Sequence, residues 1–568
     1  MARHAGTLAL TSWKIGQMSV KLGALTPAAP AAAPQPHPAL AEIRAAVAAR
    51  DFDRAGELAE RALAGGLEHP AVLNLAALRR EQQERFEDAV ALLERALKLA
   101  PDDVAAHNAL GLCLSRLERY EEALDHFDRA VALAPTFAGA HSARGAALES
   151  LGRLTAAGGA YQTAIGLEPG NLGALAGLAN LASRRGAHAE ARALALRVLA
   201  AQPGYPDAEN AVAAADLADG DAPAAQARLE ALIADPRLTA QQLAFAQGLL
   251  GDALDAQERV AEAFTAYAAC NMGLWRAYAK AFAGQASALD FAHGMIERLE
   301  AIPAARWQGP GEPLPEGVEG HVFLLGFPRS GTTLLEQVLA SHPKVEALEE
   351  RETLTDALRA YLAAPDDLLR LAEAGEAELA PLRAAYWARV REEGAKPQGK
   401  VFVDKHPLNT FKLPLIAKLF PKAKILFARR DPRDVVLSCY RRRFAMSGSA
   451  YQLLTLPGAA GYYDAAMRIA ACFEPLLATE VVRHESLIAD FDAEVGAVCG
   501  FLGLAWDDAL RGFAERTRDR GIATPSGAQL AGGLSAEGVG QWRRYRQQLA
   551  PALPKLAAWV ERFGYPAE

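Results

Sequence analysis

The 568-residue sequence has few cysteines and lacks long apolar runs. Its five cysteines stand far apart and form no Cys-x-x-Cys pair, which argues against a disulfide framework. We therefore expect reduced thiols and a cytoplasmic protein. No run approaches the ~18–20 apolar residues that a transmembrane helix needs. No His, Cys and Asp residues occur together at metal-ligand spacing, so we also expect no metal requirement.

A strong charge of either sign is also missing. The chain carries 60 basic and 68 acidic residues, for a net charge of −8, and we expect no nucleic-acid partner. Hydrophobic residues make up 51% and charged residues 23%, a balance typical of globular proteins. The length predicts two or more domains.

The first 35 residues lack the features of a folded segment. The apolar run at residues 7–11 is too short for a secretory signal, and residues 26–38 are rich in Ala and Pro. This composition predicts a disordered tail and an Ala/Pro linker over residues 1–35.

A repeat of 34 residues dominates the first half of the chain. Prolines recur at this interval, at Pro101, Pro135, Pro169 and Pro203. Small residues precede them at fixed offsets, as in the pairs Ala89/Ala96, Ala123/Ala130 and Ala157/Ala164. This period is typical of tetratricopeptide repeats, in which each unit is a helical hairpin. We predict an all-α superhelix over residues 36–275, with about six repeats and a degenerate seventh at residues 241–274.

Such arrays usually bind proteins or peptides, and we expect a partner of this kind. A scaffold or oligomerisation surface is the alternative. Residues 276–320 are predicted to form a helical connector that ends in a Pro/Gly cluster at residues 309–315. The second domain is therefore expected to span residues 321–568.

The second domain opens with a pattern for anion binding. The apolar run 321–325 predicts a buried strand, and residues 334–340 have helical periodicity. Backbone N–H groups in such a turn and the following helix dipole favour a negative group. The loop between them has the Gly-x-x-x-x-Gly spacing of a P-loop, from Gly326 to Gly331, but Thr332 and Thr333 stand where Mg-ATP P-loops have Lys and Ser or Thr. Arg329 and Ser330 complete the predicted phosphate site.

Three motifs in order resemble PAPS-dependent sulfotransferases. They are Pro-Arg-Ser-Gly-Thr-Thr at 328–333, Val-Phe-Val-Asp-Lys-His-Pro at 401–407, and a strand that ends in Arg430 with Ser438 eight residues later. The resemblance covers residues 321–566 and is strongest to the tyrosylprotein sulfotransferases and their bacterial relatives. It implies an α/β, P-loop-like domain with a parallel sheet.

The resemblance also implies roles for these residues. The loop, with Arg329, Ser330, Gly331, Thr332 and Thr333, would hold the 5′-phosphosulfate of PAPS. Arg430 and Ser438 would hold the 3′-phosphate, although Arg430 could instead form a surface ion pair with Asp431 or Asp434. Lys405 matches the lysine that stabilises the leaving group, and Arg329 would assist it. Ser526 matches a serine of a late nucleotide segment, in which Ala531-Gly-Gly533 replaces the usual basic residue and Pro.

A catalytic base is expected close to the loop. In the tyrosylprotein sulfotransferases the second Glu of a pair is the base, and Glu350 occupies this position after Glu349. An acidic helix start is the simpler alternative. His342 and His406 are rival bases, and His484 stands where the family commonly has Tyr.

The predicted reaction is transfer of a sulfuryl group from PAPS to an acceptor hydroxyl, releasing adenosine 3′,5′-bisphosphate. The repeat array favours a protein acceptor, with tyrosine as the expected residue. The alternatives are a glycan, lipid or small-molecule acceptor, a catalytically silent repeat adaptor, and a nucleotide kinase. The Arg441–Arg443 cluster could attract an acidic acceptor or form a solvated basic face.

Overall fold

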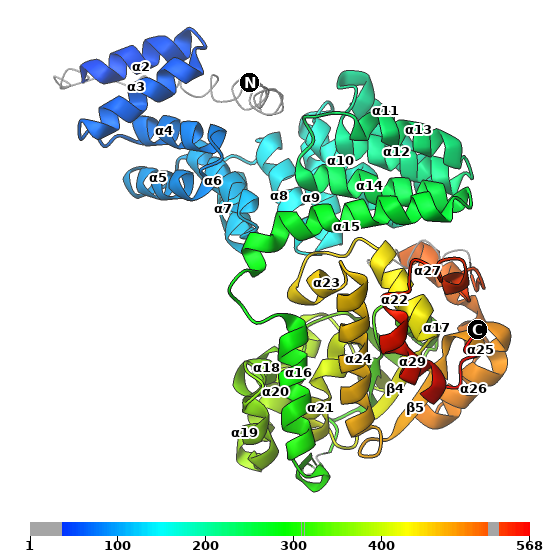
Figure 1. Cartoon of the computed structure of the whole chain (residues 1–568). Coiled ribbons are helices and arrows are strands. Elements are labelled where there is room, and N and C mark those ends of the chain that lie inside the picture. Colours follow the sequence, from blue (N-terminus) through cyan, green and yellow to red (C-terminus); the bar gives the residue numbers. More distant parts are fainter. Residues whose placement is uncertain (1–36, 308, 310, 312, 521–532) are drawn as a thin grey trace. The chain divides into compact units, whose positions relative to one another are not determined.

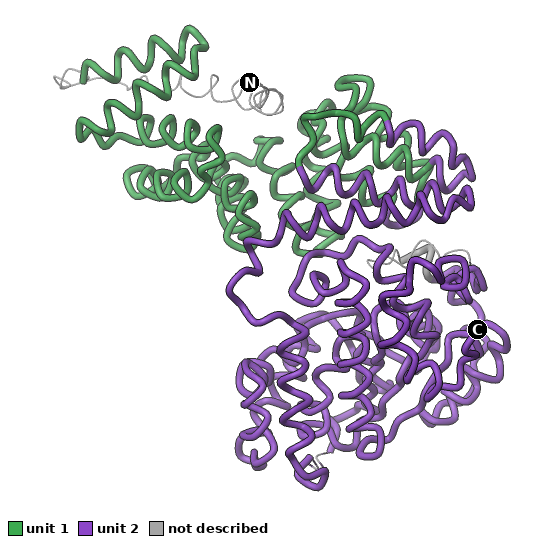
Figure 2. Tube along the Cα trace, in the orientation of Figure 1, with its two compact units in different colours: residues 1–183, 187–215, 231–239 green, residues 184–186, 216–230, 240–568 purple. Residues whose placement is uncertain are grey.

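The computed structural model describes residues 37–307, 309, 311, 313–520 and 533–568. The predicted tail over 1–35 lies outside these residues. The chain divides into two compact units (Figure 2). Unit 1 comprises residues 1–183, 187–215 and 231–239, and unit 2 comprises 184–186, 216–230 and 240–568. The predicted domain boundaries remain predictions.

Unit 1 is built from consecutive helical hairpins (Figure 1). Each of four prolines at the 34-residue interval directly follows the C-cap of the second helix of a hairpin, where its ring ends the helix. The tetratricopeptide superhelix predicted from the period is confirmed. The repeat helices run in this order: α2 Pro38–Ala48, α3 Phe52–Ala64, α4 Pro70–Gln82, α5 Phe86–Leu99, α6 Val104–Arg116, α7 Tyr120–Leu133, α8 Ala138–Ser150, α9 Leu154–Leu167, α10 Leu172–Arg184, α11 His188–Ala201, α12 Pro206–Ala218 and α13 Ala222–Ile233. Most of α13 belongs to unit 2.

Close helix packing explains the small residues of the repeat. A Cβ added at Gly111 on α6 would lie 2.6 Å from the Phe127 ring on α7. Gly145 on α8 and the Tyr161 ring on α9 show the same 2.6 Å contact. In both hairpins an aromatic side chain therefore fills the space that glycine leaves open.

Unit 2 begins its continuous stretch with a hairpin of the same design. Helices α14 (Ala240–Ala256) and α15 (Val260–Phe282) pack so that a Cβ on Gly251 would lie 2.5 Å from the Tyr267 ring. The sequence separation of this pair equals that of Gly111 and Phe127. The hairpin therefore has repeat-like packing, although it belongs to unit 2.

A five-stranded sheet forms the centre of unit 2. Its strands are β1 Val318–Leu325, β2 Val345–Glu349, β3 Lys400–Lys405, β4 Lys424–Arg429 and β5 Thr479–Arg483. Their order is β2-β3-β1-β4-β5, and all neighbouring pairs are parallel. The predicted parallel α/β fold is confirmed.

Helices cover both faces of this sheet. The α-helices and 3-10 helices (η) after α15 are α16 Ala288–Ala301, η2 Ala304–Trp307, α17 Thr332–Ala340, α18 Thr355–Tyr361, α19 Asp367–Glu373, α20 Glu376–Glu392, η3 Pro407–Lys412, α21 Leu413–Leu419, α22 Pro432–Arg441, α23 Gly448–Gln452, α24 Leu456–Phe473, α25 His484–Ala489, α26 Phe491–Leu502, η4 Asp508–Gly512, α27 Phe513–Arg520, η5 Gln541–Arg543 and α29 Leu553–Arg562. Alternate residues of β1 enter different cores. Val322 and Leu324 pack with α17 and α26, whereas Phe323 and Leu325 join the larger core with α21 and α24.

The strand order determines where a ligand can bind. β2 and β3 lie on one side of β1, and β4 and β5 lie on the other. In open parallel sheets, ligands bind outside the carboxyl ends of the strands, where the direction of winding changes. The loops after β1, β3 and β4 all leave the sheet at this edge.

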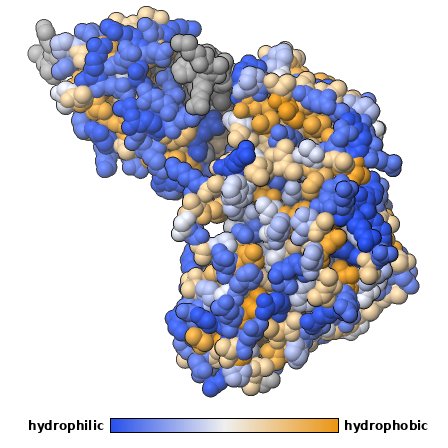
Figure 3. Space-filling model, viewed as in Figure 1, coloured by the Kyte–Doolittle hydropathy of each residue, from blue (hydrophilic) through white to orange (hydrophobic). Residues whose placement is uncertain are grey.

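The viewed surface carries hydrophilic residues over much of its area, with hydrophobic residues in smaller patches (Figure 3). Among the described residues, no helix combines the length and the apolar character needed to cross a membrane.

Candidate active site

The loop after β1 has a backbone that only glycine suits at two positions. A Cβ on Gly326 would lie 2.8 Å from the carbonyl oxygen of Ala428, and a Cβ on Gly331 would lie 2.8 Å from Nδ1 of His484. Gly331 has φ 101° and is the N-cap of α17, while Arg329 has φ 72°. With Gly326 at φ 156°, three positive-φ residues lie within this loop, and such turns form the kind of concave backbone that binds anions.

Hydrogen bonds hold this loop in place. The Phe327 N–H donates to Ser330 Oγ at 3.3 Å, and the Ser330 N–H donates to the Phe327 carbonyl at 3.1 Å. Thr410 Oγ1 donates to the Gly326 carbonyl at 2.6 Å, which ties the loop to the segment after β3. Ser330, Thr332 and Thr333 are all buried.

Arg329, Ser438 and Arg430 meet at one point. Arg329 Nε donates to Ser438 Oγ at 3.0 Å, and an Arg430 amino group donates to the Arg329 carbonyl at 3.1 Å. Arg430 also donates to the carbonyl of Gly538. Burial, followed by the neighbouring cations Arg442 and Arg430, lowers the pKa of Arg329 to about 9. A group of arginines whose charges oppose one another is suited to bind an anion.

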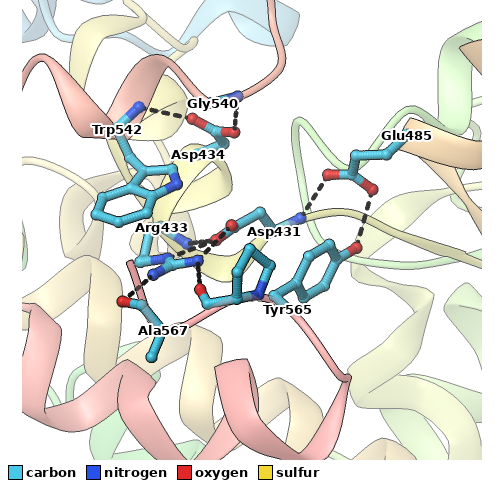
Figure 4. Close-up of polar contacts among 9 residues, drawn as sticks. Asp431, Arg433, Asp434, Glu485, Gly540, Trp542, Tyr565 and Ala567 are labelled. Carbon is cyan, nitrogen blue, oxygen red and sulfur yellow. Dashed lines mark hydrogen bonds and ion pairs between the residues drawn. The ribbon is translucent and has the colours of Figure 1, made fainter.

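The start of α22 fixes the chain around Arg430 (Figure 4). Asp434 accepts from the N–H groups of Gly540 and Trp542 at 2.7 and 2.8 Å. Asp431 pairs with Arg433 at 2.8 Å, and the Arg433 guanidinium lies 3.6 Å from the centre of the Trp542 ring. The two carboxylates therefore engage these partners, while Arg430 donates to backbone carbonyls.

Arg433 and Glu485 add further links to this region. Arg433 donates to the carbonyls of Pro566 and Ala567, and Glu485 accepts from the Asp431 N–H and the Tyr565 hydroxyl (Figure 4). These contacts bring the last residues of the chain to the N-terminus of α22.

Lys405 lies at the end of β3 and is fully buried. Its Nζ is 2.8 Å from Glu350 Oε1, 3.5 Å from Glu349 Oε1 and 3.9 Å from Glu336 Oε2. Burial opposes its charge, but these three carboxylates together raise its pKa above the ordinary value. The lysine is therefore held in its charged form. It lies beside β1, the strand that precedes the loop from Gly326 to Gly331, because Lys405 is in register with Leu324 of β1.

Glu350 projects from a constrained turn. Its φ is 45°, and its N–H donates to the Lys405 carbonyl at 2.7 Å. Thr353 Oγ1 donates to Asp404 at 2.7 Å and anchors the rest of the turn. Glu350 precedes α18, which begins at Thr355, and its side chain is 38% exposed. It can therefore reach a solvent-borne acceptor while it contacts Lys405.

The two rival histidines have other contacts. His342 is buried, with Nε2 3.0 Å from the Ala505 carbonyl and Nδ1 accepting from the Lys344 N–H at 3.1 Å. His406 Nε2 lies 3.2 Å from Glu352. Burial opposes the charge of Glu352, but His406 and Lys412 hold its pKa at about 2. Both histidines thus have structural partners.

Two residues near the site had no role predicted from the sequence, although His484 was noted as a departure from the family pattern. Glu336 on α17 is buried beside Lys405, and burial raises its pKa to about 7. His484 faces the loop, and burial, Arg430 and Arg329 lower its pKa to about 3. In the sequence, Glu336 is only a polar residue in the helix after the loop, four residues after Thr332. Its burial depends on the packing of α17 against β3.

Other predictions have different outcomes. Ser526 lies outside the described residues. Arg441 and Arg443 form ion pairs with Asp255 and Asp252, so the Arg441–Arg443 cluster is not a solvated basic face. Within the described part of the chain, no group of three or more His, Cys, Asp or Glu residues is placed to hold a metal ion.

Comparisons with known proteins match the two halves of the chain separately. A model of the sulfotransferase family matches residues 321–508, and a tetratricopeptide repeat model matches residues 74–136 and 142–206. A solved tetratricopeptide repeat protein of Thermus thermophilus has 21% identity and a TM-score of 0.28, covering 34% of this chain and 99% of that protein.

Several curated proteins are similar in sequence. An uncharacterized protein of Aquifex aeolicus (strain VF5) is 28% identical over 267 residues, 43% of this chain and 34% of its own. Protein-tyrosine sulfotransferase 2 of Gallus gallus is 28% identical over 218 residues, 37% and 57% of the two chains. Protein-tyrosine sulfotransferase of Drosophila melanogaster is 31% identical over 132 residues, 22% and 26%. The chain thus spans between 26% and 57% of these relatives.

The fold and the matches define a helical repeat array joined to a P-loop-like α/β domain with a parallel sheet. Residues 321–508 therefore resemble the sulfotransferase family and the segments before them resemble tetratricopeptide repeats, and the chain is similar in sequence to proteins named protein-tyrosine sulfotransferases.

Proposed function

We propose that this protein transfers the sulfuryl group of PAPS to a hydroxyl group, with a protein tyrosine as the acceptor. The observation that carries the proposal is the convergence, at one edge of the sheet, of an anion-binding loop with a buried lysine and a half-exposed carboxylate. The lysine is Lys405 and the carboxylate is Glu350, 2.8 Å apart.

The donor would lie across β1 and β4. The loop from Gly326 to Gly331 and the start of α17 would bind the 5′-phosphosulfate. Arg430 and Ser438 would bind the 3′-phosphate, which distinguishes PAPS from ATP. Two buried nitrogen atoms without a hydrogen-bond partner, Arg430 Nε and His484 Nδ1, support an anionic ligand here.

The chemistry then needs only groups that this edge supplies. The Glu350 carboxylate takes the proton of the acceptor hydroxyl. The acceptor oxygen forms a new bond to sulfur as the bond between sulfur and the bridging oxygen breaks. The electron pair of the broken bond stays on the bridging oxygen, which leaves with the bisphosphate. Lys405 and Arg329 stabilise the charge on that oxygen. Because Lys405 contacts Glu350, both reacting ends of the substrates are held close together.

A protein acceptor is supported by two observations. The repeat array is of a type that binds peptides and proteins. The curated relatives from Gallus gallus and Drosophila melanogaster are named protein-tyrosine sulfotransferases. Cytoplasmic localisation remains our expectation.

Sulfur-labelled PAPS tests the proposal directly. The full chain is incubated with labelled PAPS and with paired peptides that contain either one Tyr or Phe at that position. Label should enter only the Tyr peptide. Glu350→Gln should lower the rate by about 10²–10⁴-fold, the usual contribution of a positioned base. The matched control is Glu392→Gln, on the exposed end of α20.

Binding of adenosine 3′,5′-bisphosphate is measured in parallel by calorimetry. Glu350→Gln should bind it as the wild type does, because the carboxylate acts on the acceptor. Label in the glycan, lipid or small-molecule pools of a cell extract, but not in protein, would keep the reaction and reject the protein acceptor. Absence of bisphosphate binding, or tighter binding of ATP, would reject the proposed donor.

A further inference from the structure

The hairpin α14–α15 is bonded to the segments that surround Arg430. The centre of this contact is Asp255, near the end of α14, whose side chain is 11% exposed. Asp255 accepts from Arg544 at 2.7 Å and from the Tyr545 hydroxyl at 2.6 Å, and it also pairs with Arg441. A single carboxylate of the hairpin therefore joins the end of α22 to the segment after η5.

Neighbouring contacts strengthen this junction. Asp252, one turn earlier on α14, pairs with Arg443 at 2.8 Å and accepts from the Tyr267 hydroxyl at 2.9 Å. From α15, Asn271 Nδ2 donates to the Tyr440 carbonyl at 2.9 Å. Tyr440 also stacks on Phe264 of α15 with the ring centres 5.4 Å apart. The hairpin thus holds the C-terminal end of α22 by both polar and aromatic contacts.

Both segments held by Asp255 lead directly to the candidate nucleotide site. Arg441 lies one helical turn after Ser438, which accepts from Arg329. Arg544 and Tyr545 follow Trp542, whose backbone N–H is fixed by Asp434, and Gly538 shortly before it accepts from Arg430. A shift at Asp255 would therefore move Ser438 and Gly538 relative to Arg430.

We propose that Asp255 is a positioning residue for the nucleotide site. It acts through Arg441 on α22 and through Arg544 and Tyr545 on the following segment. The repeat-like hairpin α14–α15 is then a working part of the donor site. Coupling between such elements is reciprocal, so a bound nucleotide must also stabilise the hairpin. This inference rests on PAPS as the proposed donor, and its product, adenosine 3′,5′-bisphosphate, is the probe used to test it.

If Asp255 positions the site, its replacement should weaken nucleotide binding, whereas its charge alone predicts that the replacement strengthens binding. Removing the charge of Asp255 leaves Arg441 and Arg544 without that carboxylate and makes the region more positive, which favours an anion. Displacement of Ser438 and Gly538 from Arg430 would instead weaken binding of the nucleotide. Asp255→Asn tests the sum of both effects, whereas Tyr545→Phe removes one hydrogen bond at constant charge. Glu300→Gln is the matched control, because it breaks an exposed ion pair with Arg468 in the same unit.

Calorimetry on the full chain gives the first readout. We expect the Kd of adenosine 3′,5′-bisphosphate to rise about tenfold in Asp255→Asn, within the usual range of coupling between sites. In Tyr545→Phe it should rise about threefold, the size of effect expected from the loss of one hydrogen bond. KM for PAPS should rise with it, while kcat at saturating PAPS stays within about twofold of the wild type. The control should match the wild type. Folded variants with wild-type Kd would overturn the proposal.

Hydrogen exchange without nucleotide gives an independent readout. In Tyr545→Phe and Asp255→Asn, amides of residues 433–443 and 536–546 should exchange faster than in the wild type and in Glu300→Gln. Equal exchange would refute the positioning role. If Asp255→Asn does not fold, Tyr545→Phe still decides the outcome by both measurements.

The two proposals can fail separately. If the wild type does not bind the bisphosphate, the proposed donor is wrong, whatever the exchange of the variants shows. If the wild type binds it and the folded variants bind equally well, only the role of Asp255 is wrong. In the wild type, nucleotide should also slow exchange in residues 247–256 of α14, and no slowing there would contradict the coupling.

Discussion

Replacing Lys405 with Met should destabilise unit 2 in a pH-dependent way. Lys405 is fully buried between three carboxylates, of which Glu336 is 4% exposed, Glu349 27% and Glu350 38%. Removing one partner of a buried ion pair costs about 3–5 kcal/mol. Glu349 and Glu350 can regain water, so the cost is expected to fall mainly on Glu336.

Protonation of Glu336 gives this prediction its pH dependence. Burial already raises its pKa from 4.5 to about 7. A carboxyl whose folded pKa lies above its unfolded pKa binds the extra proton in the folded state. Its contribution to stability is therefore present at low pH and is lost as the pH rises through the folded pKa. Without Lys405 that pKa should rise further, because the nearest cation is gone.

The expected loss of unfolding free energy is about 3–5 kcal/mol at pH 8 and at least about 1 kcal/mol smaller at pH 5.5, since each unit of pKa shift equals about 1.4 kcal/mol. This loss of unfolding free energy is measured in the full chain by urea unfolding, with tryptophan fluorescence as the signal. The signal reports on unit 2, because six of the seven tryptophans lie in it: Trp275, Trp307, Trp387, Trp506, Trp542 and Trp559.

A double variant provides the control. Glu336→Gln in the Lys405→Met background should restore about 2 kcal/mol at pH 8, because both members of the buried pair are then neutral. Additive effects of the two substitutions, together with the same loss at pH 5.5 and pH 8, would refute the reasoning.

Three further substitutions test the loop and the repeats. Gly331→Ala should weaken bisphosphate binding about tenfold, because φ is 101° and the new Cβ would lie 2.8 Å from His484; unchanged affinity in calorimetry would contradict this. Arg430→Gln should weaken binding and reduce its salt dependence, and an unaltered salt slope would exclude a charge contact. Gly111→Val should destabilise unit 1 by about 1–3 kcal/mol, because its Cβ would lie 2.6 Å from the Phe127 ring; an unchanged thermal midpoint would show that α6 and α7 can separate.

Much of the fold was predictable because its signals are local. The 34-residue period, with a proline after the second helix of four hairpins, depends on contacts between neighbouring helices, so the repeats could be predicted from spacing alone. The strand before Gly326 and the helix after Gly331 were predictable in the same way. An anion site of the P-loop type lies between a strand and a helix N-terminus, and this order is visible in the chain.

The buried surroundings of the site were not predictable. Glu336 looks like any polar residue in an amphipathic helix, and only the packing of α17 against β3 places it 3.9 Å from Lys405. The low exposure that raises its pKa is a property of the assembled core.

By itself, the sequence determined the repeat array, the parallel α/β domain and the loop from Gly326 to Gly331. The tertiary structure decided what the Arg441–Arg443 cluster does. From the chain alone it could attract an acidic acceptor or face solvent, but Arg443 pairs with Asp252, 191 residues away in the sequence. The physical reason is that a short segment shows which residues are charged but not which charges they meet. The partner of a charge depends on which distant elements pack together and exclude water from between them.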